Sequence, residues 1–169
     1  MHSEIQDIRN AMNVTSVRLR GSGFSPERLK AVKKGLRTLH NLETMAVTVY
    51  QYQISRRNSE HDRLLIAAMI NEMTHLQDFQ SKLYEYGFRP FLFRPAFWIA
   101  GIITGWISRA AGPNAVLKTG IWLESKAVNH YSELLRDIEW DEDSRAILEK
   151  DKSDEQHHID TWKRLQEGG

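Results

Sequence analysis

Two sets of metal-binding residue types recur along this chain with nearly the same spacing. Each set is a single glutamate followed, 29 or 31 residues later, by a Glu-x-x-His pair. One Glu-x-x-His arises easily by chance, but two pairs, each with its upstream glutamate and apolar surroundings, are typical of a di-metal carboxylate site in a four-helix bundle. The candidate ligands are Glu43, Glu72, His75, Glu124, Glu155 and His158.

The charge of the carboxylates explains why such a site needs cations. A carboxylate buried without a partner costs several kcal/mol or takes up a proton, so four of them on inward-facing helix stripes would oppose folding. Two divalent cations balance about four negative charges, and two imidazoles complete their coordination. Oxygen ligands combined with imidazole suit iron or manganese, so we expect two iron ions, with manganese as the alternative.

The position of each ligand on its helix predicts its role. In a Glu-x-x-His pair the two side chains share one helix face, so the glutamate can bridge both metals while the histidine binds one. Glu72 and Glu155 are therefore the expected bridges. Glu43 and Glu124 are expected to be terminal ligands, and we expect no catalytic residues beyond the metal ligands.

Polar residues next to the two pairs are candidates for orienting the ligands. Asn71 and Asp154 each stand immediately before the glutamate of a pair, and a ligand histidine usually passes its second ring N–H to such a group. We expect these two side chains to reach the histidines across the bundle.

Four other residues near the ligands are further candidates for contacting them, although their spacing indicates this less clearly. Asp151 lies one turn before Glu155, and His130 lies six residues after Glu124; each contacts a ligand or faces water. Tyr50 and Tyr131 each lie seven residues after a terminal glutamate. Core packing with a hydrogen-bonded hydroxyl is the commoner role of such tyrosines.

Apolar residues at three- and four-residue spacing predict four long helices that carry these side chains. The first starts at Ser25-Pro26 and reaches about residue 54, and the second starts after a capping box at Ser59 and ends at Gly87. The third follows Gly112-Pro113, and the fourth begins near Asp141. No segment alternates with the period of a strand. We therefore predict an all-α, ferritin-like four-helix bundle over residues 25–169, preceded by a polar N-terminal arm over residues 1–24.

The long crossover between the two helix pairs, residues 87–112, carries an extra apolar helix. Fourteen uncharged residues, from Pro95 to Ser108, lie between two arginines, and a membrane-spanning helix needs about 20. Tryptophans and arginines at its ends are typical of the boundary between lipid and water. We favour contact of residues 88–110 with a membrane surface. A cap packed over the bundle or a dimer surface is the alternative.

The composition narrows the class of protein. The chain has 169 residues, a formal net charge of +1 and no cysteine, which excludes disulfides and thiolate metal sites. No basic run suggests nucleic acid as a partner. The first ten residues lack the apolar core of a secretory signal, so we expect a peripheral protein on the cytoplasmic face of the membrane, not a secreted one. A homo-oligomer or a biosynthetic complex stays open.

These residues also form a pattern that resembles the demethoxyubiquinone hydroxylase family, membrane-bound di-iron monooxygenases of ubiquinone biosynthesis. The resemblance covers most of the chain after the arm and includes all six ligand positions. Its segments are His40-x-x-Glu43, Val49-Tyr50-x-x-Gln53, Glu72-x-x-His75-Leu76-x-x-Phe79, Arg89-Pro90 with Pro95, Trp98 and Ala100-Gly101, Glu124 with His130-Tyr131, and Glu155 with His157-His158.

The resemblance implies that a polyprenylated quinone is hydroxylated with O2 and with electrons ultimately from NADH. This chain departs from the family beside the first ligand, where Leu39-His40-Asn41-Leu42-Glu43 replaces the usual Asp-His-Ala-Gly-Glu, and Tyr52 stands where a glycine is expected. These changes add bulk near Glu43. The alternatives are a ferritin-like iron-oxidising or iron-binding protein, another iron or manganese oxidase without a quinone substrate, and a non-enzymatic scaffold.

Overall fold

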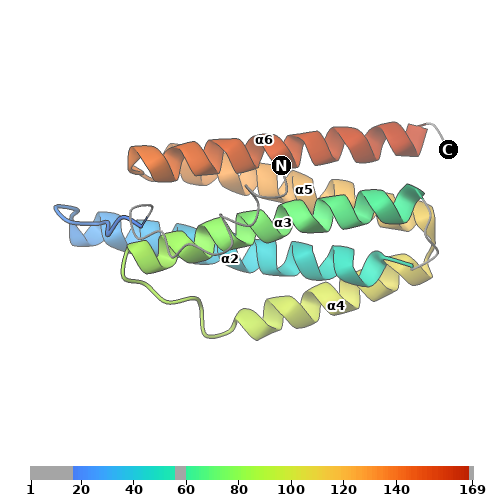
Figure 1. Cartoon of the computed structure of the whole chain (residues 1–169), viewed down its shortest axis with the longest axis horizontal. Coiled ribbons are helices and arrows are strands. Elements are labelled where there is room, and N and C mark those ends of the chain that lie inside the picture. The colour runs from blue at the N-terminus through green and yellow to red at the C-terminus, as the bar shows by residue number, and fades with distance from the viewer. Residues whose placement is uncertain (1–16, 56–59, 168–169) are drawn as a thin grey trace, which may run out of the picture.

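A computed structural model describes residues 17–55 and 60–167, and in these ranges it contains helices and no strand (Figure 1). The prediction of an all-helical bundle with an extra helix in the crossover is confirmed. The helices are α2 (Pro26–Gln53), α3 (Glu60–Glu85), α4 (Arg94–Ala110), α5 (Pro113–Asp137) and α6 (Glu142–Glu167).

The helix ends follow from local sequence signals. The Ser25 hydroxyl accepts a hydrogen bond from the Arg28 backbone N–H at 3.2 Å, which satisfies one of the unpaired N–H groups of the first turn of α2. Asp141 caps α6 by accepting from the Ser144 backbone N–H at 3.1 Å. Gly87 follows α3 with a φ of 72°, a left-handed conformation that favours glycine. The predicted capping box at Ser59 lies outside the described residues.

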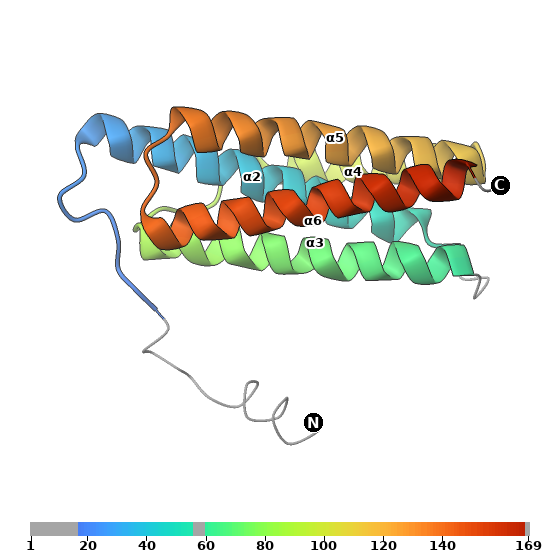
Figure 2. The ribbon, with the colours of Figure 1, turned by 90° about the horizontal axis from the view of Figure 1, so that it is seen from above.

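Two antiparallel hairpins form the bundle (Figures 1 and 2). Helix α2 packs along α3, and α5 packs along α6, while α2 also meets α5 and α3 meets α6. Two apolar clusters fill the interior. One contains Leu36, Phe79 and Tyr131, and the other contains Tyr50, Leu65 and Trp162. Because Glu43 and Glu72 fall between these clusters in sequence, the polar residues are held in the middle of the bundle.

Helix α4 lies on the outside of α2 and packs closely against it. A Cβ atom at Gly101 would come within 2.7 Å of the Thr48 Cβ, and one at Gly105 within 2.7 Å of the Val49 carbonyl oxygen. Only glycine allows this approach. One turn later, Gln53 Nε2 donates a hydrogen bond to the Ser108 hydroxyl at 2.9 Å. The small residues of α4 thus determine which of its faces is covered.

The opposite face of α4 is apolar and exposed. Its large side chains are 47% to 65% exposed, and they are Trp98, Ile99, Ile103, Trp106 and Ile107. The segment before α4 adds the exposed side chains of Phe91, Leu92 and Phe93. None of the helices in the described part of the chain is long and apolar enough to cross a membrane.

The described part of the N-terminal segment, residues 17–24, contacts the bundle through Arg20. Its guanidinium group pairs with Glu85 at the end of α3, and with Asp141 and Asp143 at the start of α6. The Arg20 backbone N–H also donates to the Glu85 carbonyl oxygen at 2.8 Å. This ion-pair cluster joins the ends of two helices from different hairpins.

Candidate metal centre

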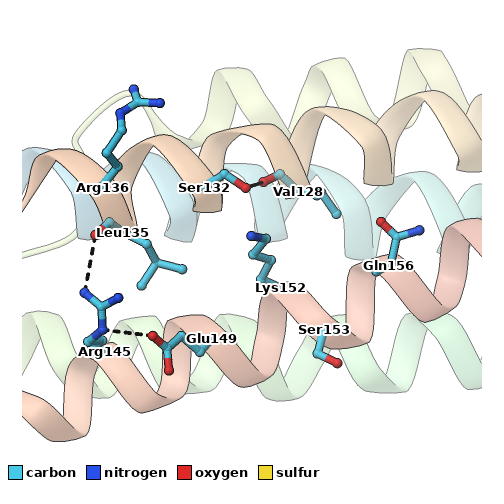
Figure 3. A pocket seen from close by; sticks show the side chains of 9 residues that line it. All are labelled: Val128, Ser132, Leu135, Arg136, Arg145, Glu149, Lys152, Ser153 and Gln156. Atoms are coloured by element: carbon cyan, nitrogen blue, oxygen red, sulfur yellow. Dashed lines mark hydrogen bonds and ion pairs between the residues drawn. The ribbon is translucent and has the colours of Figure 1, made fainter.

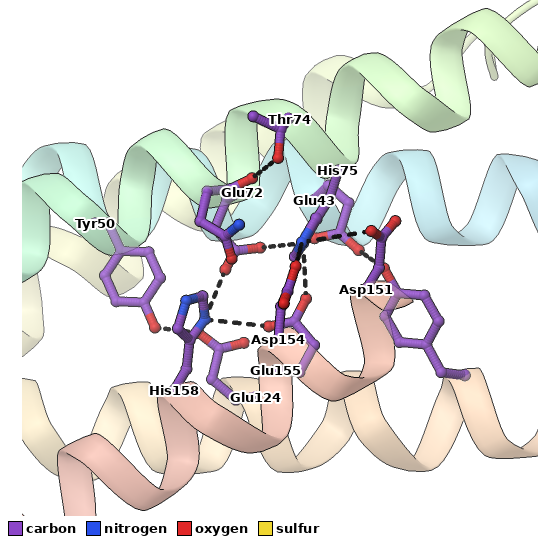
Figure 4. Close-up of polar contacts among 12 residues, drawn as sticks. Glu43, Tyr50, Glu72, Thr74, His75, Glu124, Asp151, Asp154, Glu155 and His158 are labelled. Carbon is purple, nitrogen blue, oxygen red and sulfur yellow. Dashed lines mark hydrogen bonds and ion pairs between the residues drawn. The ribbon is translucent and has the colours of Figure 1, made fainter. Parts of the chain in front are cut away.

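All six predicted ligands come together in the middle of the bundle, each helix of the four-helix core contributing at least one (Figure 4). Their donor atoms form two groups, and within each group the atoms lie within 4.8 Å of one another. The first group is Glu43, Glu72, His75 and Glu155, and the second is Glu72, Glu124, Glu155 and His158. Glu72 and Glu155 belong to both groups, as expected for bridging ligands.

The buried polar atoms at the centre have the arrangement that metal ions would satisfy. Glu72, His75 and Glu155 have no exposed surface. Both carboxylate oxygens of each glutamate, together with Nδ1 of His75 and of His158, lack a hydrogen bond of acceptable geometry. Buried polar atoms in native proteins rarely stay without a partner. Four carboxylates and two imidazole nitrogens are also the donor set expected for a pair of iron or manganese ions.

Each histidine reaches across the bundle to the other pair. Nδ1 of His75 lies 3.1 Å from a carboxylate oxygen of Glu155 and 3.6 Å from one of Glu72. Nδ1 of His158 lies 3.1 Å from Glu72 and 3.3 Å from Glu155. Glu72 and Glu155 therefore stand between the two histidines, and Nδ1 is the ring nitrogen of each histidine that faces them.

Burial and mutual repulsion raise the pKa of the terminal ligands. Removal from water raises the pKa values of Glu43 and Glu124 well above the usual range, and the charges of Glu155 and Glu72 raise them further. Burial also acts to raise the pKa of Glu72, but its contacts with His158 and His75 outweigh that effect and lower it to about 2. Burial and repulsion thus favour the protonated form of the terminal glutamates, whereas the low pKa of Glu72 favours its charged form.

The pKa values of the two histidines shift in the direction opposite to that of Glu72. Burial by itself lowers the pKa of an imidazole, but contacts with Glu155 and Glu72 raise the pKa of His75 to about 12 and that of His158 to about 9. Both rings are therefore positively charged at pH 7 without metal. Protons balance the carboxylates in this state, and a divalent cation must displace them because it binds neutral imidazole.

Two buried tyrosines hold the terminal ligands from the opposite hairpin. The Tyr131 hydroxyl donates a hydrogen bond to Glu43 at 2.7 Å, and the Tyr50 hydroxyl donates to Glu124. Each tyrosine thus bonds the glutamate of the other set, not the one seven residues before it. The two halves differ beyond this point, because Trp162 Nε1 donates to the Tyr50 hydroxyl at 3.2 Å, whereas Tyr131 packs on the Phe79 ring.

The predicted orienting residues behave differently from one another. Asp154 reaches across the bundle, with Oδ2 3.2 Å from His75 Nε2, and Asp151 lies 3.6 Å from the same nitrogen. With Nδ1 directed at the centre, His75 can donate its Nε2–H to these carboxylates. Asn71 does not mirror Asp154: its side-chain oxygen is buried without a hydrogen bond, and nothing in the structure explains this. His130 is nearly half exposed and lies 4.0 Å from Glu133.

A cavity of about 220 Å³ leads to the terminal ligands between α2 and α5. Glu43 and Glu124 are part of its wall, and His130 is part of its lining. Of its apolar wall residues, the sequence pointed to Leu42 as added bulk near Glu43, but not to Met45, Ala46, Trp122, Leu123 and Ala127. No periodicity could have identified them, because the cavity exists only where two helices fail to fill the space between them.

A hollow of about 590 Å³ lies elsewhere, between α5 and α6 (Figure 3). It contains none of the six ligands, and part of its wall is occupied by an ion pair between Arg145 and Glu149 at 2.8 Å. The smaller cavity, in contrast, has Glu43 and Glu124 in its wall.

Comparison with known proteins agrees with this geometry. The family model described as "Ubiquinone biosynthesis protein COQ7" matches residues 30–167, which contain all six ligands. The chain belongs to the COQ7 family. A "3-demethoxyubiquinol 3-hydroxylase" of Cupriavidus taiwanensis is 33% identical over 139 residues, covering 81% of this chain and 67% of that protein.

Other relatives of this COQ7-family chain are more distant in sequence. A protein of the same name from Legionella pneumophila is 27% identical over 140 residues, covering 82% of this chain and 66% of the relative. An "NADPH-dependent 3-demethoxyubiquinone 3-hydroxylase, mitochondrial" of Dictyostelium discoideum is 26% identical over 157 residues, with coverages of 89% and 71%. The chain thus spans about two thirds of the length of several curated relatives that it matches.

The sharing of two glutamates predicts how metal content responds to substitution. We expect Glu72→Ala and Glu155→Ala to bind few or no metal ions, because each removes a ligand from both donor groups. Glu43→Ala and Glu124→Ala each affect one group and should retain about one ion per chain. Elemental analysis after anaerobic loading with Fe(II) and gel filtration measures this, with the exposed Glu133→Ala as the control. Equal metal content in Glu72→Ala and Glu43→Ala would contradict the bridging role.

The raised histidine pKa values predict proton release on metal binding. Because pH 7 is below the pKa values of both imidazoles, each ring carries an extra proton. Metal loading should therefore release at least two protons per chain, and metal affinity should rise with pH. The raised pKa values of Glu43 and Glu124 add to this release. Calorimetric titration with Mn(II) in buffers of different ionisation enthalpy measures the number. A value near zero at pH 7 would show that the centre is not protonated before metal binds.

Proposed function

We propose that this chain is a di-iron monooxygenase that hydroxylates the ring of a polyprenylated quinone of the demethoxyubiquinol type. The observation that carries the proposal is the combination of two donor groups sharing Glu72 and Glu155 with a cavity that ends at Glu43 and Glu124. A substrate in that cavity would lie directly beside the metal pair. The names of the relatives supply the class of substrate.

The surroundings of the cavity fit an apolar substrate. Met45 lines the cavity, and its backbone carbonyl lies 2.9 Å from the position of a Cβ at Gly101 of α4. The cavity thus adjoins the line along which α4 packs on α2. A hydrophobic molecule that leaves a lipid surface beside α4 would pass Met45 and Leu42 before it meets the carboxylates. A bare iron-oxidising centre has no need of an apolar approach of this kind.

We propose that the exposed face of α4 lies on a membrane surface. Tryptophans and isoleucines form this face, and Arg109 stands over the Trp106 ring at 5.5 Å, a pairing typical of the lipid headgroup region. Burial of such side chains stabilises association by roughly 25 cal/mol per Å² of apolar surface. Peripheral attachment would hold the cavity next to the source of its substrate. The cytoplasmic-face location stays a prediction.

The reaction replaces a ring C–H by C–OH with one atom of O2, while the other atom leaves as water. It consumes two electrons and two protons. A reduced nicotinamide nucleotide is the reductant class that we propose, because the Dictyostelium relative is named NADPH-dependent. Two iron ions, when bound, would supply the O2 activation, and iron suits this chemistry better than manganese.

The protein side chains have defined tasks in this scheme. Glu72 and Glu155, which belong to both donor groups, would hold the ions together with His75 and His158. The Tyr131 and Tyr50 hydroxyls fix Glu43 and Glu124 from across the bundle, so that neither terminal ligand can swing into the cavity. Asp154 accepts from His75 Nε2 and keeps Nδ1 directed at the metal. The buried apolar clusters on both sides exclude water from the centre.

Isotope labelling tests the proposed reaction. Iron-loaded, reduced protein exposed to ¹⁸O2 with a short-chain demethoxyquinol should yield a product heavier by one labelled oxygen atom. Glu72→Ala should lose this activity by at least about 100-fold, since loss of metal removes the chemistry, whereas Glu133→Ala should keep it. Mass spectrometry of the extracted quinone gives the result.

Two outcomes would count against the proposal. If Fe(II) is oxidised at the same rate with and without quinol and no label enters the ring, the centre is an iron-oxidising site. If the purified protein contains two manganese ions per chain and disproportionates peroxide, it is a different oxidase.

A further inference from the structure

A second hollow, of about 460 Å³, lies on the outer side of α2, where this helix meets the segment that leads into α4. Its wall consists of four basic side chains and two uncharged polar side chains from α2, Thr38 and Asn41, together with two aromatic rings. The basic residues are Lys30, Lys33, Lys34 and Arg37, and the rings are those of Phe91 and Phe97. The hollow contains none of the metal ligands.

The basic side chains of this hollow have no acidic partner among the described residues. Within the described part of the chain, no carboxylate forms an ion pair with any of these four side chains. Arg37 Nε donates a hydrogen bond to the Arg89 carbonyl oxygen at 2.9 Å, and Lys33 Nζ lies 5.6 Å from the centre of the Phe88 ring. Two of the cations are thus held by neutral groups, and Lys30 and Lys34 are exposed on the surface.

The hollow is continuous with the exposed apolar surface. Phe91 belongs to its wall, and the next two residues, Leu92 and Phe93, are 83% and 64% exposed. Phe97 lies in the first turn of α4, one residue before Trp98, which begins the exposed face. A surface that touches the outer face of α4 would therefore also meet the mouth of this hollow. Only a ligand with both an anionic group and an adjoining apolar part matches that combination.

We propose that this hollow binds the phosphate headgroup of an anionic phospholipid. The inference rests on the proposed membrane contact of α4 and adds a selective site to it. Clusters of basic residues beside an amphipathic surface attract anionic lipids within about a Debye length, roughly 8–10 Å at physiological salt. The four cations would hold the phosphate, and the aromatic rings would contact the glycerol and the start of the acyl chains.

Such a site would fix the orientation of the bundle on the membrane. The apolar face of α4 alone allows rotation about its axis, whereas a second attachment point at the start of α4 does not. The lysines lie on α2 between the helix start and Leu42, which lines the cavity to the metal centre. A bound headgroup would therefore place the cavity entrance at a constant height relative to the lipid.

Vesicle binding by the full iron-loaded chain tests the site. The probes are vesicles of phosphatidylcholine alone and vesicles that also contain phosphatidylglycerol, separated by flotation. The wild-type protein should bind both and prefer the anionic ones, a preference that falls as salt rises. Lys30→Gln combined with Lys34→Gln should weaken binding to anionic vesicles by about tenfold or more and leave binding to neutral vesicles unchanged.

A matched control removes the same charge elsewhere. Lys152→Gln combined with Lys163→Gln, on α6 and away from α4, should bind both kinds of vesicle like the wild type (Figure 1). If both double variants lose binding to anionic vesicles equally, the net charge of the protein determines the binding, and the proposed site does not exist. If the Lys30→Gln/Lys34→Gln variant binds anionic vesicles as tightly as the wild type does, the proposal is overturned.

Two further measurements separate this inference from the proposed function. Ile103→Ser, on the exposed face of α4, should weaken binding to both kinds of vesicle. If the wild type binds neutral vesicles no better than this variant, the membrane contact itself fails. Calorimetry with inorganic phosphate provides the remaining comparison. Binding of soluble phosphate that depends on Lys30 and Lys34, without any vesicle preference, would assign the hollow to a soluble anion and overturn the lipid proposal.

Discussion

Four carboxylates lie in the middle of a small helical bundle, and their mutual repulsion is the constraint that the rest of the structure must satisfy. Bound protons reduce this repulsion in part, because the pKa values of Glu43 and Glu124 are strongly raised and both histidines are charged without metal. The carboxylate oxygens of the bridging pair nevertheless lack hydrogen bonds. Cations bound at this centre would both balance the charge and pair these oxygens.

Each of the two helix hairpins supplies contacts to the buried glutamates of the other hairpin. Each histidine lies close to the bridging glutamate of the opposite hairpin, and each tyrosine bonds the terminal glutamate of the opposite hairpin. The metal centre therefore joins the hairpins as well as being held by them. The exchange is not fully symmetric, because Tyr50 is linked to Trp162. Among the described residues, His75 has an aspartate partner across the bundle and His158 has none. The two metal positions thus have different surroundings.

Sequence periodicity predicted most of the fold and the gathering of the six candidate ligands, since the three-residue spacing of Glu72 and His75 fixes a common helix face before any packing is known. The caps at Ser25 and Asp141 were equally local. Features that depend on two helices meeting could not be predicted in this way. The partners of Tyr50 and Tyr131 follow from the relative height of the hairpins, and the cavity beside Met45 follows from imperfect packing. Equivalent sequence positions suggested that Asn71 would mirror Asp154, but the structure shows no such contact.

The central claim is that two metal ions lie between Glu72 and Glu155. Anomalous diffraction at the iron edge from crystals of Fe(II)-loaded protein tests it most directly. We expect two peaks about 3.5–4 Å apart, each next to Nδ1 of one histidine. A rival position exists, because Asp151 and Asp154 form a third donor group with His75. A single peak, or a peak at Nε2 of His75 between these aspartates, would contradict the account.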